Sequence, residues 1–174
     1  MSTVTLAPIV NNDPTIGLNF DALAVLLNGG LDSTNLRNDP WISWTPTFTG
    51  ATVGNGTITA WYFKLQRFVA FRILFTFGST SATGGSGMAF TLPVTAATYN
   101  ATSQSYNIGV GTAYDSLTNN FPLSIWMVSA TTAIPTIHVA DSTDVYAGNI
   151  SATRPMVWTT SDALQLQGYY ESAI

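Results

Sequence analysis

The sequence indicates a mainly β protein: an antiparallel β-sandwich or jelly-roll domain preceded by an extended N-terminal arm and one short helix. Three observations support this fold class. Only one segment of the 174 residues has helical periodicity, and short alternating segments separated by turn residues run from Trp41 onward. Hydrophobic residues make up 46% of the chain, which is enough to fold, although only 8% are charged, against about 25% in an average soluble protein.

Residues 1–40 are expected to form a region separate from the β domain of residues 41–174. Pro8 and Pro14 interrupt a weakly alternating stretch, which indicates an extended arm. A short helix is expected next, capped by Asn19 or Asp21, with apolar residues three and four apart and Asn28-Gly29-Gly30 at its end. Because so short a helix is unstable alone in water, we expect it to dock on the β domain, a sister chain or a larger assembly.

The strongest turn signal of the β domain is Asn55-Gly56. It lies between Thr47-Phe48-Thr49 and Thr57-Ile58-Thr59, which predicts a two-residue hairpin. The clearest strand signals are alternating apolar residues, which share one buried face. These are Val69, Phe71, Ile73, Phe75 and Phe77, then Met88, Phe90 and Leu92, and finally Leu164, Leu166 and Tyr170. Further strands are expected over residues 106–110, 121–128 and 134–139, and a Gly/Ser/Thr loop over 78–87.

Charge and composition exclude several classes of function. A net charge of −4, with no Lys or Arg between Ile73 and Thr153, argues against nucleic acid as a partner, because phosphate binding needs clustered cations. The absence of cysteine excludes thiolate metal sites, cysteine nucleophiles and disulfides. No apolar run is long enough to insert into a membrane, and residues 1–10 lack the basic start of a secretory signal.

The sequence contains few residues that could serve in catalysis, and we expect no enzyme activity, no cofactor and no metal. His138 is the only histidine, and its neighbours in the strand favour a surface position. Asp141 and Asp144 are close in sequence, and Asp115 or Asp162 is a candidate to join them in space. Eight of the nine acids are Asp, which favours turn formation over a calcium site made from these oxygens, and either of these over hydrolysis.

Aromatic residues are the remaining candidates for a functional surface, either stacked on glycan rings or buried between sister chains. The candidates are Trp41, Trp44, Trp126 and Tyr169, which, like Arg72 and Leu74, stand where a monomer would place Lys and Glu. We therefore expect a homo-oligomer, the alternative being a monomer with a Thr-rich β surface. The loops 80–87 and 97–105 are the other candidate places for a glycan site.

Several motifs form a set across about half of the chain. The set comprises Trp44-Thr45-Pro46-Thr47-Phe48-Thr49-Gly50, Gly54-Asn55-Gly56-Thr57, Tyr62, Phe75-Thr76-Phe77-Gly78-Ser79-Thr80-Ser81, Leu92-Pro93-Val94, and Trp158, Asp162, Leu164, Leu166, Gly168 and Tyr170-Glu171 at the end. It resembles β domains of tail-fibre, minor tail and head-fibre proteins of tailed bacteriophages. Residues 19–35 are similar to the short helix and Leu-Asn-Gly-Gly-Leu-Asp-Ser element of such proteins.

This resemblance implies a homotrimer of the virion surface, made in the host cytoplasm, attached to capsid or tail through residues 1–40 and exposing residues 41–174. It implies a non-enzymatic short fibre, spike or decoration protein that stabilises the particle, binds host surface glycans, or both, and it brings no catalytic residues. The alternatives are a stand-alone bacterial carbohydrate-binding β-sandwich module and, third, a polysaccharide hydrolase.

Overall fold

The structure is a computed structural model that describes residues 41–85, 87–98, 106–116, 119–140 and 145–174. Contacts divide the chain after Asp39, and all described residues belong to the second unit, Pro40–Ile174. The arm and the helix expected within residues 1–40 therefore lie outside the described residues.

The described residues form β-strands and no helix, which confirms the mainly β fold class. Every strand pairing among them is antiparallel. The strands are β1 (Ile42–Ser43), β2 (Phe48–Thr49), β3 (Ala51–Thr52), β4 (Thr57–Leu65), β5 (Phe68–Thr76), β6 (Ala82–Thr83), β7 (Ala89–Thr91), β8 (Tyr106–Tyr114), β9 (Asn120–Ser129), β10 (Thr132–Ala140), β11 (Val145–Asn149) and β12 (Ala163–Glu171).

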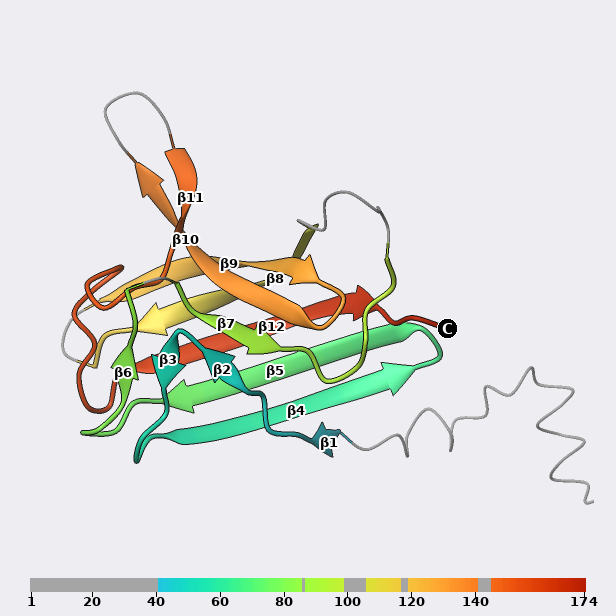
Figure 1. Ribbon diagram of the computed structural model, residues 1–174, viewed down its shortest axis with the longest axis horizontal. Coiled ribbons are helices and arrows are strands. Elements are labelled where there is room, and N and C mark those ends of the chain that lie inside the picture. Colours follow the sequence, from blue (N-terminus) through green and yellow to red (C-terminus); the bar gives the residue numbers. More distant parts are fainter. Residues whose placement is uncertain (1–40, 86, 99–105, 117–118, 141–144) are drawn as a thin grey trace, which may run out of the picture. The chain divides into compact units, whose positions relative to one another are not determined.

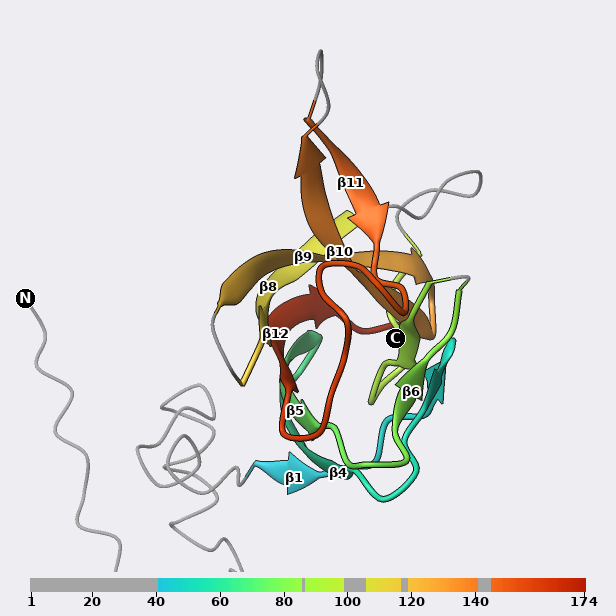
Figure 2. The ribbon, with the colours of Figure 1, turned by 90° about the vertical axis from the view of Figure 1, so that its left-hand side faces the viewer.

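One large sheet has the order β1-β4-β5-β12-β8-β9-β10-β7-β2, with β11 paired to β10, while β3 and β6 form a separate pair. The last strand, β12, therefore lies in the middle of the sheet, between β5 and β8 (Figure 1). Figure 2 shows how the sheet curls from β4 at the bottom through β5, β12 and β8 to β9 and β10 at the top. This curl gives the sheet an inner face, which surrounds the core, and an outer face.

Aromatic contacts join the two ends of the curled sheet across its interior. Phe48 on β2 and Phe90 on β7 belong to one end of the strand order, far from β5. Nevertheless, the ring centroid of Phe48 is 5.2 Å from that of Phe75 on β5, and the ring centroid of Phe90 is 5.8 Å from that of Phe71 on β5. All four side chains are buried. The two halves of the sheet thus pack face to face, in the manner of a sandwich.

The alternation in the sequence is confirmed on the inner face. The apolar residues expected to share one buried face in β5, around β7 and in β12 are all buried. Their neighbours on β5, such as Phe68, Arg72 and Leu74, are exposed on the outer face. Side chains alternate between the two faces of a strand, so one buried set also determines the outer set.

The hairpin predicted at Asn55-Gly56 is wrong. The turn exists, and Gly56 N donates to Val53 O at 2.9 Å, but β2 pairs with β7 and β4 pairs with β1 and β5. Asn55 instead holds a second turn: its Oδ1 accepts from Thr80 N at 2.9 Å, and its Nδ2 donates to Ser79 Oγ at 3.0 Å. The Asn-Gly signal therefore located a turn, whereas distant contacts selected the strand partners.

Candidate binding face

The outer face of four adjacent strands, β4, β5, β12 and β8, forms the candidate site. Strand register places on this face Thr59, Trp61, Phe63 and Leu65 from β4; Phe68, Ala70, Arg72 and Leu74 from β5; Gln165, Gln167 and Tyr169 from β12; and Val110, Thr112 and Tyr114 from β8. Large apolar side chains on it are exposed, including Phe68 at 47%, Val110 at 55% and Tyr169 at 65%. Adjacent exposed apolar side chains in this number are typical of a surface that binds a ligand or another protein.

Arg72 lies in the middle of this face, close to two indole rings. Its guanidinium carbon is 4.7 Å from the centroid of the Trp41 ring and 5.1 Å from that of the Trp61 ring. Trp61 is directly opposite Arg72 in the β4–β5 pair, and Trp41 immediately precedes β1, which pairs with β4. Both distances fall within the range of a cation–π contact, so we call these three side chains the Trp–Arg–Trp stack.

A hollow of about 490 Å³ lies beside the stack, along the first half of β12. Its polar lining consists of side chains from four strands: Thr59, Arg72, Thr112, Gln165 and Gln167. Within the described part of the chain, the hydroxyls and amides of these side chains form no hydrogen bond with the protein. They are therefore available to a ligand.

A second hollow, of about 540 Å³, continues along β12 and shares Arg72, Val110 and Gln167 with the first. Trp41 and Tyr169 both line it. The described lining of a third hollow, around the end of β12, includes the aromatic side chains of Phe68, Tyr106, Tyr169 and Tyr170. There the ring centroids of Tyr169 and Phe68 are 5.8 Å apart and the two rings stack. Along β12, the outer face thus changes in character: amides and the Arg72 cation lie near Gln165, and stacked aromatic rings lie at Tyr169.

The structure places the four aromatic candidates in different surroundings. Trp41 and Tyr169 both line the second hollow. Trp44 is half-buried and packs against the hydrophobic core, so it does not belong to the outer face. Trp126 is half-buried on β9, opposite Asn107, which also lines the second hollow. Trp126 therefore lies at the margin of the site.

The sequence offered Trp61, like the other tryptophans, as a residue that could stack on a sugar, but it did not predict that Trp61, Gln165 and Gln167 share one site. A signal for the two glutamines was present: the buried alternation of Leu164 and Leu166 places them on the opposite face. Nothing in the sequence showed that this face of β12 would lie beside β5 and β8. The three hollows are lined by strands, not by the loops 80–87 and 97–105, and residues 86 and 99–105 lie outside the described part of the chain.

His138 is exposed, as predicted, and its Nε2 lies 3.0 Å from Ser124 Oγ on the neighbouring strand. A catalytic serine–histidine pair also requires a third group that orients the imidazole. Among the described residues, no carboxylate contacts His138.

Asp162 is fully buried and binds backbone groups. Its Oδ1 accepts from Ser116 N at 2.9 Å and its Oδ2 from Thr159 N at 2.6 Å. This is the turn-forming role expected of aspartate. Asp115 N donates to Asn119 O at 2.9 Å in the turn after β8, while Asp141 and Asp144 lie outside the described residues. The described residues contain no group of three His, Asp or Glu that could hold a metal ion.

No family model, no curated protein and no solved structure matches this chain. Within its described residues, no helix has the length and apolarity needed to cross a membrane. The outer face is therefore interpreted from its own chemistry.

Proposed function

We propose that this chain is a non-enzymatic structural protein of a tailed-phage virion, exposed on capsid or tail, and that the outer face of its β domain binds host surface glycan. The virion assignment rests on the motifs that resemble phage fibre and minor tail proteins. The binding role rests on one observation: the Trp–Arg–Trp stack lies beside a hollow lined by amides and hydroxyls that have no hydrogen-bond partner among the described residues.

This arrangement suits a sugar because a sugar ring has both apolar and polar sides. Its C–H face can pack on the Trp41 and Trp61 indoles, while its hydroxyls can exchange hydrogen bonds with Gln165 and Gln167. The side chains project from paired strands, which hold them in fixed positions. A stable scaffold with an open, partly aromatic face fits a protein that works outside the cell on extended polysaccharide.

A glycan array probed with the full chain tests the binding role. Trp41→Ala should weaken binding to the best glycan at least about fivefold, equivalent to about 1 kcal/mol, because it removes one wall of the stack. Val157→Ala is the control, since Val157 is 68% exposed and lines none of the three hollows. Absence of binding to every glycan, or equal weakening by both variants, would contradict a glycan role for this face.

The virion assignment has a separate test. Mass spectrometry of gradient-purified particles should find the chain at a fixed ratio to the major capsid protein. Deletion of residues 1–40, the proposed attachment segment, should abolish incorporation. A chain found only in the soluble fraction would instead favour the stand-alone carbohydrate-binding module.

The aromatic end of the outer face supports a second role, self-association. Phe68 and Tyr169 stack on each other yet remain 47% and 65% exposed, and the nearby Glu171 is neutralised by Arg67. Copies of the chain can therefore meet there without like-charge repulsion. We propose that this end forms the contact of a homotrimer, with the stack and the first hollow left open.

The third hypothesis, a polysaccharide hydrolase, makes a different prediction. It requires polysaccharide turnover that is lost on Asp141→Asn or Asp144→Asn. Detection of such turnover would overturn the non-enzymatic proposal.

A further inference from the structure

We infer that the hollow beside Arg72 selects glycans that carry a carboxylate, such as those built from uronic or sialic acids. This inference rests on the proposed glycan-binding function and adds the chemical class of the ligand.

The first argument is that Arg72 has no acidic partner within the described part of the chain. Among the described residues, no carboxylate forms an ion pair with Arg72, whose guanidinium lies close to the Trp41 and Trp61 rings. Three acidic residues are described, and two of them have other partners: Asp162 accepts from backbone N–H groups, and Glu171 pairs with Arg67. A cation left without a carboxylate at the centre of an apolar face is suited to an anion from outside.

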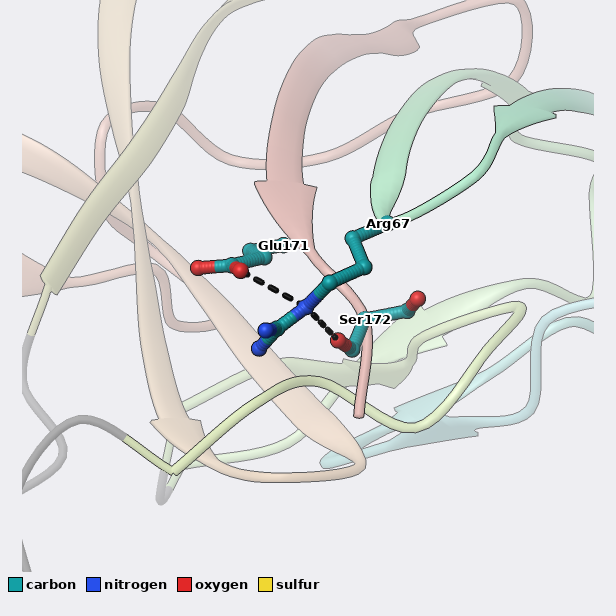
Figure 3. A network of polar contacts seen from close by, with 3 residues as sticks. All are labelled: Arg67, Glu171 and Ser172. Carbon is teal, nitrogen blue, oxygen red and sulfur yellow. Dashed lines mark hydrogen bonds and ion pairs between the residues drawn. The ribbon is translucent and has the colours of Figure 1, made fainter. Parts of the chain in front are cut away.

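Arg67 provides the contrast within the same chain. It lies at the turn between β4 and β5, where its Nε is 2.7 Å from Glu171 Oε1 and donates to Ser172 O at 3.4 Å (Figure 3). This arginine is occupied in holding the end of β12 and the residue that follows it. Arg72, five residues further along the chain, has no comparable partner among the residues that the structure describes.

The second argument is the geometry of the guanidinium. A guanidinium stacks on aromatic rings through its flat faces, whereas its N–H groups point outward in its own plane. The Trp41 and Trp61 rings, with centroids 4.7 and 5.1 Å from its guanidinium carbon, restrict Arg72, while none of its N–H groups forms a hydrogen bond with a described residue. Such a restrained, planar donor set matches the two oxygens of a carboxylate, and the restraint reduces the entropy lost on binding.

The third argument is the charge of the whole hollow. Of the described residues that line it, Arg72 alone is charged, and the polar side chains of residues 59, 112, 165 and 167 are neutral amides and hydroxyls. One cation among neutral groups fits one carboxylate on an otherwise neutral, hydroxylated sugar. A densely charged polymer would require a cluster of cations instead.

The inference is tested with the full chain and matched pairs of ligands. The glycan array should contain cellobiouronic acid, which has one carboxylate, with its carboxyl-reduced form cellobiose, and 3′-sialyllactose with lactose. The strongest binders should be acidic, and reducing the carboxyl groups should lower affinity at least about tenfold, equivalent to about 1.4 kcal/mol. If neutral glycans bind as tightly as their acidic counterparts, this inference is wrong and the glycan-binding proposal stands. If no glycan binds, the proposed function itself fails.

Two arginine variants locate the effect. Arg72→Gln should abolish the preference for the acidic member of each pair, and Arg72→Lys should restore it only in part, because an ammonium lacks the planar fork. Lys64→Gln is the charge-matched control, since Lys64 is exposed on β4 but belongs to the opposite face of the sheet. Circular dichroism should show that all three variants remain folded. A preference that persists in folded Arg72→Gln, or that Lys64→Gln also removes, would overturn the assignment to Arg72.

Discussion

Tyr170 shows how a single polar group is accommodated in the core. Its side chain is only 5% exposed, and its hydroxyl donates to Val94 O at 2.6 Å and accepts from Val94 N at 3.1 Å. Desolvation by burial raises the pKa of Tyr170 well above its ordinary value, although the bond to Val94 opposes this effect. One hydroxyl thus ties the middle of the sheet to the segment after β7.

We expect Tyr170→Phe to lower the free energy of unfolding by about 1–3 kcal/mol, because it leaves both backbone groups of Val94 without this partner. Urea unfolding measures the change. Tyr169→Phe is the control, since Tyr169 is 65% exposed and the substitution should change stability by less than about 0.5 kcal/mol. Equal effects of the two substitutions would contradict the role assigned to the buried hydroxyl.

The raised pKa of Tyr170 also predicts a pH dependence. The unfolded chain loses this proton near pH 10, whereas the folded chain retains it, so above about pH 10 the unfolded state binds fewer protons and stability falls. The difference in unfolding free energy between wild type and Tyr170→Phe should therefore shrink as the pH rises above 10. Thermal unfolding of both proteins at pH 8 and at about pH 10.5 checks this.

At the scale of elements, the central position of β12 depends on glycine at its contact with β8. Gly168 lies opposite Gly109, and a Cβ at Gly168 would be 2.3 Å from Ile108 O and 2.9 Å from the Phe71 ring. The backbone of β8 and a buried ring on β5 thus leave no room for a side chain. Glycine is required here for close approach, not for an unusual backbone conformation.

Gly168→Ala should destabilise the protein by about 1–3 kcal/mol, through overpacking and separation of β8 from β12. Gly85→Ala is the matched control, because a Cβ at Gly85 would meet nothing within 4 Å. That substitution should be neutral or slightly stabilising, since alanine reduces the entropy of the unfolded chain. Denaturant midpoints of the two variants that coincide would contradict the close approach.

The elements also show why some of the fold was predictable. Side-chain alternation is local, so the buried faces of β5 and β12 followed from residues that are neighbours in sequence. The Asn55-Gly56 turn was local as well, but its flanking strands found other partners because Phe48 packs against Phe75 and Phe90 across the core. Local signals predicted strands and turns better than strand pairing.

At the scale of the whole molecule, the small fraction of charged residues determines what the outer face of the sheet can contact. A monomer would normally interrupt an exposed sheet face with Lys and Glu, which also prevent association. Here the strands β4, β5, β12 and β8 present mainly rings, aliphatic groups, amides and hydroxyls. A surface of this kind is suited to contact with sister chains and with uncharged parts of a glycan.

Self-association can be tested by placing a charge at the aromatic end of the face. Sedimentation velocity should show the full chain as a trimer, and Tyr169→Lys should shift it toward monomer, because the new ammonium would be desolvated in the contact. Val157→Lys introduces the same charge at a valine that is 68% exposed and should leave the trimer intact. A monomeric wild type, or dissociation by Val157→Lys alone, would contradict the proposed contact.

The candidate site shows which features follow from residues close together in the chain and which depend on contacts between distant strands. Composition and alternation were sufficient for the β class, the inward residues and the presence of exposed aromatics, because these depend on residues close together in the chain. The Trp–Arg–Trp stack and the amides of Gln165 and Gln167 come together only when β12, the last strand, pairs between β5 and β8. That pairing depends on packing over the whole sheet, since hydrogen bonding alone would let any antiparallel edge serve as a partner.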